Sequence, residues 1–283
     1  MNKVYFHSKN DEQRYLRNIY YMLFVFLLFG IYKNGITLYY NHLISILDLF
    51  KPLFLGLISV VISIGFSLLF KEKILSYRLI SNLLVSLIVM PNISYLVFVI
   101  VLLVLNIIYH FIRFNIPAFF MVIVSAVSII MHNYSYLNTY ESSRTLQYGF
   151  LDYLFGKGMG GISNTFLLLT IICGIVLICN RQYKKHIVLS FLIGNLIFNI
   201  VKCFIAKEIV IGTFLNNNII FGVIFISTIS IHSTYTRGGS YLYGILLSIL
   251  CFIASFFDIN LGFYLAVCLL SSCSKLLDRP FIR

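Results

Sequence analysis

Charged residues are scarce in this chain of 283 residues: Asp, Glu, Lys and Arg together make up only 11% of it. Tryptophan is absent, proline occurs only four times, and 60% of the residues are hydrophobic, with a mean hydropathy of +0.96. A soluble domain of this size does not need so much apolar surface, and runs such as 53–70 are long enough to cross a hydrocarbon core of about 30 Å. The short alternating segments of an outer-membrane barrel are missing. The composition therefore predicts an all-α polytopic membrane protein in a lipid bilayer.

Acidic residues are scarcer still, with nine Asp and Glu against 21 Lys and Arg and a formal net charge of +12. Such an excess can indicate nucleic-acid binding, but here the basic residues gather in alternate candidate loops. Cytoplasmic loops of membrane proteins carry an excess of Lys and Arg. The distribution therefore predicts a multi-pass protein of the inner (cytoplasmic) membrane with both termini in the cytoplasm, and no nucleic-acid partner. The basic residues of the predicted cytoplasmic side lie at 1–17, 71–78, 113, 181–185, 237 and 275–283.

Several signatures of catalysis and metal binding are also missing. The six cysteines lie in or near apolar runs without CxxC spacing, which favours small apolar side chains over metal ligands or disulfides. There is no GxSxG, Walker A or HExxH motif, and no two histidines have metal-ligand spacing on one helix face. About twenty polar residues precede the first apolar run, so we expect that run to remain in the membrane and not to be a cleaved signal.

The apolar runs predict ten membrane-spanning helices. An even number places both ends on the same side, in agreement with the charge distribution, and two halves of five helices would be inverted relative to one another. We expect one membrane domain over 1–283, made of a cytoplasmic tail (1–18), a first half (19–131), an extracytoplasmic polar loop (132–162) and a second half (163–283). The expected helices lie at about 20–32, 53–70, 75–90, 94–110, 117–131, 163–179, 186–202, 209–230, 241–257 and 261–276.

The polar stretch 132–164 interrupts these apolar runs and is rich in hydroxyls, amides and glycines, so we expect the functional chemistry there. Its glycines at 156, 158 and 161 satisfy GxGxxG, but a dinucleotide fold would need a preceding strand and a βαβ unit. Two interpretations remain, a tight loop that leads into the next helix or backbone N–H groups that meet an anionic or polar ring ligand. Upstream, the SSRT segment (142–145) is either an ordinary external loop or a ligand site, and the tyrosines around it form an interfacial belt or pack on a ring.

Five segments of the chain are informative together because of their order. They are RLISNLLVSLIVMP (78–91), RFNIPAFF (113–120), GMGGISNTFLLLTIICGIVLI (158–178), RQYKKHIVLSFLI (181–193) and GVIFISTISIHSTYTRGGSYLYGILLSIL (222–250). In this order they resemble the RnfD/NqrB family, which comprises a membrane component of Rnf-type electron-transport complexes and its counterpart in the sodium-pumping NADH:quinone reductase. The resemblance implies the urea-transporter-like architecture of that family, with inverted five-helix halves.

The resemblance also implies a flavin site. In that family a Thr in a Ser-x-Ala-Thr motif carries FMN through a phosphoester that a flavin transferase makes, and Thr145 stands at the corresponding place, with Arg144 at the position of the Ala. The implied function is electron relay within a complex, with ion transport as an optional coupled step, and not stand-alone catalysis. Implied partners are other membrane and FMN-bearing subunits, and the family pattern leaves room for a second, non-covalent flavin (riboflavin) among the helices. The candidate cofactor-binding residues are Ser142, Ser143, Arg144, Thr145, Gly158, Gly160, Gly161, Asn164 and Thr165.

Two other functions remain open. Polar residues within the apolar runs could line the pore of a small-solute channel or transporter of the same architecture without flavin; they are Asn106, Asn195, Asn199 and the asparagines at 216–218. The chain could also be an assembly subunit without a cofactor.

Overall fold

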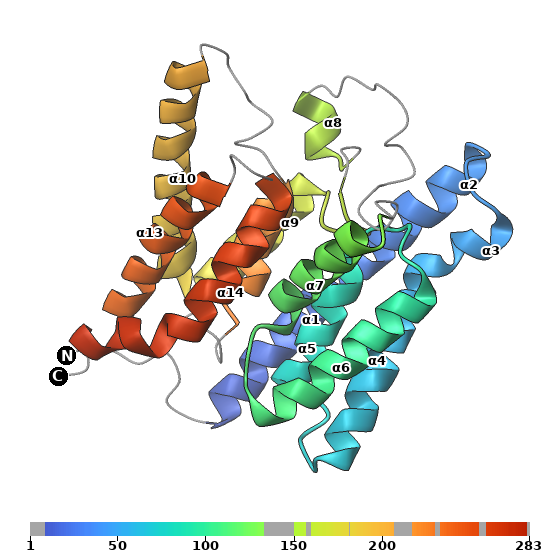
Figure 1. Cartoon of the computed structure of the whole chain (residues 1–283), viewed down its shortest axis with the longest axis horizontal. Helices are drawn as coiled ribbons and strands as arrows, with labels where there is room; N and C mark the ends of the chain where they lie inside the picture. Colours follow the sequence, from blue (N-terminus) through green and yellow to red (C-terminus); the bar gives the residue numbers. More distant parts are fainter. Residues whose placement is uncertain are drawn as a thin grey trace.

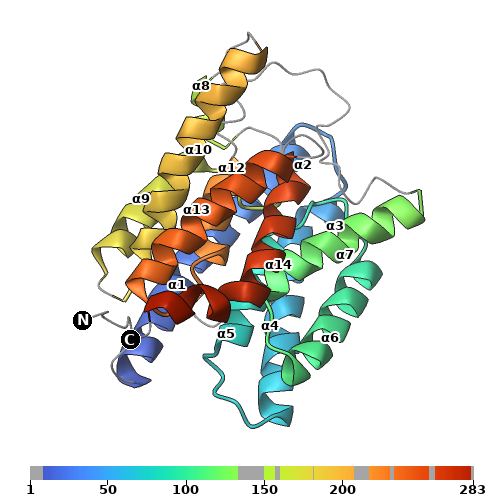
Figure 2. The same ribbon diagram turned by 60° about the vertical axis from the view of Figure 1, so that its left-hand side comes forward.

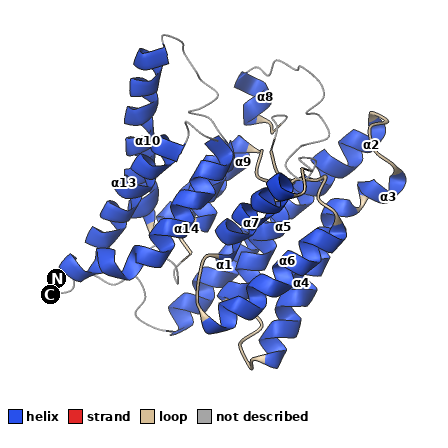
Figure 3. Cartoon of the chain, in the orientation of Figure 1, coloured by secondary structure: helices blue, strands red, loops and turns tan. Residues whose placement is uncertain are grey.

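The computed structural model describes residues 9–132, 150–156, 160–180, 182–206, 217–229, 233–254 and 259–281. Every regular element in these ranges is helical (Figure 3), which confirms the predicted all-α class. The elements are α1 (Lys9–Ile31), the π-helix η1 (Tyr32–Thr37), α2 (Leu38–Tyr40), α3 (Ile46–Leu49), α4 (Lys51–Leu69), α5 (Tyr77–Ile88), α6 (Tyr95–Phe111), α7 (Ile116–Ile130), α8 (Phe150–Leu154), α9 (Leu167–Cys179), α10 (Lys185–Ala206), α12 (Asn217–Phe221), the π-helix η3 (Gly222–Ile226), α13 (Arg237–Ala254), α14 (Ile259–Asp278) and the 3₁₀-helix η4 (Arg279–Phe281).

Five of the described helical stretches are long and apolar enough to cross a membrane, judged by length and composition. They are Asp11–Tyr40, Lys51–Leu69, Lys185–Lys202, Arg237–Ala254 and Leu261–Phe281, and α5, α6, α7 and α9 are shorter apolar helices. The outer faces of these helices carry large exposed apolar side chains, including Val61, Leu96 and Phe204. Such faces suit contact with lipid and agree with a polytopic membrane protein.

The first helix begins earlier than the sequence predicted. α1 starts at Lys9, inside the expected tail, and continues through η1 and α2 to Tyr40. Its buried side chains include Tyr15, Leu16, Ile19 and Leu23, which recur every three to four residues and therefore lie on one face. Burial of this face explains why the helix begins within the polar N-terminal segment that was expected to be a tail. The start of α1 and the end of α14 lie at the same end of the bundle (Figures 1 and 2).

Two short helical segments are enclosed by the others. All twelve residues of α5 are buried, and at 1.5 Å per residue the helix measures about 18 Å, too short to cross a bilayer. It ends where Val89 turns extended, shortly before Pro91. The second segment joins α12 to η3, and its Phe221 and Phe225 rings pack edge-on against Phe26 of α1 at 5.1 and 5.4 Å. The predicted helix 209–230 is thus described only from residue 217, and its regular part ends at 226.

The remaining long helices surround these segments. α13 packs between α10 and α14, and α14 also contacts α7, so helices from distant parts of the sequence lie side by side (Figure 2). The contact between α10 and α13 is close because small residues face each other: a Cβ on Gly244 would meet the Ser190 side chain, and one on Gly194 would meet Ser248. Small residues in membrane helices allow such close backbone approach.

Candidate functional site

The loop 160–166, which leads into α9, is the point where the predicted site meets the rest of the fold. α9 begins at Leu167, later than the predicted start at 163. Its N-cap is Phe166, which makes no side-chain capping bond. The side chains of residues 163–165 therefore do not cap this helix.

The loop is anchored to the end of α5 and to η1. The backbone N–H groups of Ile162 and Ser163 donate to the carbonyls of Val89 and Leu87, each at 2.9 Å. Asn34, in η1, donates from Nδ2 to the Ile162 carbonyl at 2.5 Å. These bonds pair the loop with the backbone at the end of α5, which is available because α5 stops at residue 88. The early end of α5 thus creates the anchor for the candidate site.

Two glycines permit this close approach. A Cβ on Gly161 would collide with the carbonyl oxygen of Ile88, so only glycine fits beside the end of α5. A Cβ on Gly160 would meet Thr165 Cγ2 at 2.5 Å, Asn218 Oδ1 at 2.9 Å and Asn164 Oδ1 at 3.3 Å. The amide oxygens of two asparagines, one from the loop and one from α12, therefore converge on Gly160.

Buried polar groups and one cation line this junction. Ser163, Asn164 and Thr165 are all at least 99% buried. Lys33, from η1, donates to Thr165 Oγ1 at 2.9 Å. Among the residues that the structure describes, Ser163 Oγ and Asn164 Oδ1 have no hydrogen-bond partner. Because a buried polar atom without a partner is costly, such atoms often mark a place where a ligand or water supplies the missing bond.

The structure brings together four of the predicted site residues and leaves the others outside its described part. Gly160, Gly161, Asn164 and Thr165 lie at this junction. The segment 142–145, with the proposed attachment residue Thr145, and Gly158 lie outside the described residues. Sequence reasoning missed Lys33 and Asn34, which come from a helix more than 120 residues away. Their only signal in the sequence was a polar pair at the end of an apolar run.

A second polar cluster, which the sequence reasoning did not identify, lies between α4, α5 and α6. Arg78 is fully buried in the second position of α5, and its guanidinium donates twice to the carboxylate of Glu72, each time at 3.1 Å. It also donates to the carbonyl of Asn106 at 3.1 Å. The rings of Phe66, Phe70 and Tyr109 surround the guanidinium, with centroids between 5.1 and 5.5 Å from Cζ.

The cluster continues into the bundle through amides. Asn82 and Asn106 exchange hydrogen bonds of 3.1 Å in both directions, and Asn82 also donates to Ser63 Oγ at 2.7 Å. The side chains of Asn82, Asn106 and Ser63 in this cluster therefore bond to one another. Two other candidates for a pore lining lie on α10, where Asn199 Nδ2 donates to the carbonyl and to the side-chain oxygen of Asn195. Asn106 thus belongs to a different helix and a different network from these two.

A third cluster ties the loop before α13 to the end of α14. Asp278 accepts from the backbone N–H groups of Tyr235 and Thr236, at 2.8 and 3.1 Å, and from Thr236 Oγ1 at 2.7 Å. Lys184 is fully buried and donates to Ser233 Oγ at 2.8 Å and to its carbonyl at 3.3 Å. Burial lowers the pKa of Lys184 to about 7, although the charge of Asp278 acts in the opposite direction.

Within the described part of the chain no three His, Cys, Asp or Glu residues gather to hold a metal ion.

Comparison with known proteins adds two findings. Residues 130–283, more than half of the chain, match the NQR2, RnfD, RnfE family. A stretch of 111 residues is 32% identical to a component of the ion-translocating oxidoreductase complex of Methanosarcina acetivorans. That match covers 39% of this chain and 37% of the relative, so the chain aligns with little more than a third of the relative's length. The family match includes the junction loop, α9 and all the elements that follow.

Proposed function

Because the chain belongs to the NQR2, RnfD, RnfE family, we propose that it is a membrane electron-transfer subunit of an Rnf-type redox complex, which carries FMN on Thr145 and relays electrons between partner subunits. The observation that carries the proposal is the junction at 160–165. It combines a nearby cation, Lys33, with buried polar atoms that have no partner among the described residues, and it follows the polar segment that holds Thr145. The name of the relative, which is part of an oxidoreductase complex, supports the same class.

The groups at the junction suit a flavin by their chemistry. A flavin ring offers a donor N–H and several acceptor atoms along its polar edge, and when bound it supplies redox chemistry that no side chain can. Asn164 Oδ1 would accept from such a ring, Ser163 Oγ would donate, and Lys33 would offset negative charge. Thr145 would hold the phosphate of FMN, with Ser142, Ser143 and Arg144 beside it. A second flavin without a covalent bond is part of the proposal.

We also propose that the fold consists of two inverted halves of five helices, with ten segments in a urea-transporter-like arrangement. The two short buried segments support this. When the continuous stretch α1–α2 is counted as one helix and the short helices α3 and α8 are left out, α5 is third in the first half and α12 with η3 is third in the second half. The fifth helices, α7 and α14, pack against each other across the halves. Both termini would be cytoplasmic in the inner membrane, as the basic residues near the ends of α4, α6 and α14 suggest.

The attachment can be tested by co-expression with a flavin transferase. The wild-type chain should show flavin fluorescence in a denaturing gel and a mass increase on the peptide that contains Thr145. Thr145→Ala should abolish both signals, whereas the matched variant Thr139→Ala, in the same polar segment, should keep them. A colourless wild-type protein, or fluorescence that survives Thr145→Ala, would contradict the proposal. Wild-type protein that lacks flavin and conducts a solute in liposomes would instead favour the channel.

A further inference from the structure

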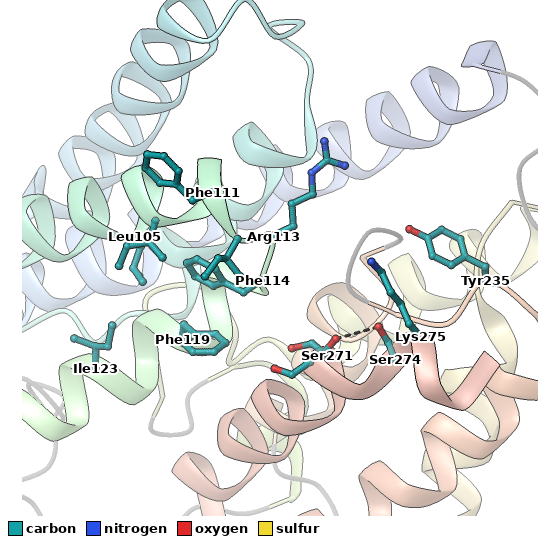
Figure 4. Close-up of a pocket in the computed structure, with 13 residues that line it drawn as sticks. Leu105, Phe111, Arg113, Phe114, Phe119, Ile123, Tyr235, Ser271, Ser274 and Lys275 are labelled. Atoms are coloured by element: carbon teal, nitrogen blue, oxygen red, sulfur yellow. Dashed lines mark hydrogen bonds between the residues drawn. The ribbon is translucent and has the colours of Figure 1, made fainter. Parts of the chain in front are cut away.

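A groove at one end of the bundle is not used by the proposed flavin chemistry. It lies between the corner that joins α6 to α7 and the last turns of α14, and it has a volume of about 880 Å³. Figure 4 shows its two parts. The guanidinium of Arg113, the amine of Lys275 and the hydroxyl of Tyr235 gather at one end, and apolar side chains, among them Leu105, Phe119 and Ile123, line the other.

The polar end of the groove presents positive charge without a matching anion. Within the part of the chain that the structure describes, neither Arg113 nor Lys275 forms an ion pair with a carboxylate. The carboxylate of Asp278, on the turn after Lys275, is already engaged by three bonds from Tyr235 and Thr236. Among the described residues, these two cations therefore line the groove without an ion pair, although the carboxylates of Asp278 and Glu12 lie close enough to Tyr235 to raise its pKa.

The remaining polar groups decide which atoms are available to a ligand. Burial raises the pKa of Tyr235, with smaller opposing and reinforcing effects from Arg113, Asp278 and Glu12, so its hydroxyl stays a hydrogen-bond donor near neutral pH. The hydroxyls of Ser271, Ser272 and Ser274 donate to carbonyls of their own helix. These hydroxyls form part of the polar wall of the groove. They can accept hydrogen bonds from a ligand, but they do not donate to it because their protons are already used within the helix. The donors offered to a ligand are thus Arg113, Lys275 and Tyr235.

The apolar end opens outward from the bundle. Phe111 is 78% exposed, and Ile112 and Ile108 are also exposed beside it. The groove lies where α6 and α14 end, which is the depth of the bilayer interface for helices that lie in a membrane. A ligand that fits must therefore combine an anionic head with long apolar chains. We propose that this groove binds an anionic glycerophospholipid, with its phosphate between Arg113 and Lys275 and its acyl chains along Leu105, Phe119 and Ile123.

This choice follows from the charge and the position of the groove. Basic pockets between membrane helices on the cytoplasmic side bind anionic head groups, and the basic end of this bundle is the one predicted to be cytoplasmic. A free phosphate would use only the cations, and an apolar helix from a partner would leave them unpaired. The inference rests on the membrane location of the chain and does not depend on flavin.

Binding can be measured by native mass spectrometry of the full-length chain in detergent, titrated with dioleoyl-phosphatidylglycerol or dioleoyl-phosphatidylcholine. The wild type should prefer the anionic lipid by at least about tenfold. Each cation near an anionic head group contributes a factor of about five, so the Arg113→Gln/Lys275→Gln variant should bind phosphatidylglycerol about 25-fold more weakly. The matched control, Lys71→Gln/Lys73→Gln, removes two cations from the same end of the bundle but outside the groove. It should change the affinity by less than about threefold.

The proposal would be overturned by equal wild-type affinity for both lipids, by an equal loss in the control variant, or by displacement of the lipid by soluble glycerol phosphate at the same concentration. If the double variant does not fold, Ile123→Trp fills the apolar end without altering charge, and it should weaken phosphatidylglycerol binding by a similar factor. A photoreactive residue at position 108 in native membranes should cross-link to lipid, and a protein adduct would also contradict the inference. Flavin fluorescence of each variant is read separately, so a failure here leaves the proposed redox function untouched.

Discussion

The buried ion pair between Arg78 and Glu72 allows a quantitative test of what holds α5 in place. We expect Glu72→Gln to remove the anion and to leave a guanidinium that is fully buried without a countercharge. Two hydrogen bonds to a charged group contribute about 1.5–3 kcal/mol each. The Glu72 side chain is 35% exposed, so water screens and partly replaces it. Two bonds at the lower limit of that range give about 3 kcal/mol, and solvent screening reduces this figure, so we expect a loss of about 2–3 kcal/mol in the free energy of unfolding.

A second variant separates the charge from the packing. In Glu72→Gln/Arg78→Met the cation is removed together with the anion, and Met fills similar apolar space between the rings of Phe66, Phe70 and Tyr109. We expect the double variant to be destabilised by about 1–2 kcal/mol less than the sum of the single variants, because neither charge remains unpaired.

The assay is unfolding by sodium dodecyl sulfate in mixed micelles, followed by far-ultraviolet circular dichroism because the chain has no tryptophan. Lys73→Gln, an exposed neighbour of Glu72, is the matched control and should stay within about 0.5 kcal/mol of the wild type. If Glu72→Gln also stayed within that margin, or if the two substitutions were additive, the ion pair would not hold α5, and the reasoning would be wrong.

Two further predictions concern the junction loop and the buried lysine. Gly161→Ala should destabilise the protein by at least about 2 kcal/mol because the added Cβ collides with the Ile88 carbonyl. The control Gly65→Ala, where nothing lies within 4 Å of the added Cβ, should be neutral or stabilising by about 0.5–1 kcal/mol. Equal effects of the two substitutions in the same unfolding assay would refute this contact. Lys184 has a folded pKa of about 7 against an ordinary value of 10.5, so unfolding takes up a proton between these values and stability should rise with pH across that window. Lys184→Met should remove this rise from the unfolding midpoints measured between pH 7 and 10, and an unchanged slope would show that the lysine is not the titrating group.

The sequence was sufficient to predict most of the helices, because a membrane segment must be apolar along its own length and the requirement is local. The regular parts of α4, α6, α7, α10 and α13 lie close to the predicted ranges. Errors occurred where distant residues decide the boundary. α1 extends to Lys9 because Tyr15 and Leu16 are buried against other helices. α9 begins late because Ile162 and Ser163 pair with the end of α5.

For the candidate site, sequence alone determined that residues 160–165 are polar, rich in glycine and placed just before a helix. Only the tertiary structure decided that Gly160 faces Asn218, that Lys33 reaches Thr165, and that Asn164 Oδ1 is buried without a partner among the described residues. The same holds for Arg78, whose partners at Glu72 and Asn106 come from a loop and another helix. Hydropathy reports how much each residue prefers to leave water, a property of that residue alone. Which polar side chains meet depends on how all the helices pack, and no single segment carries that information.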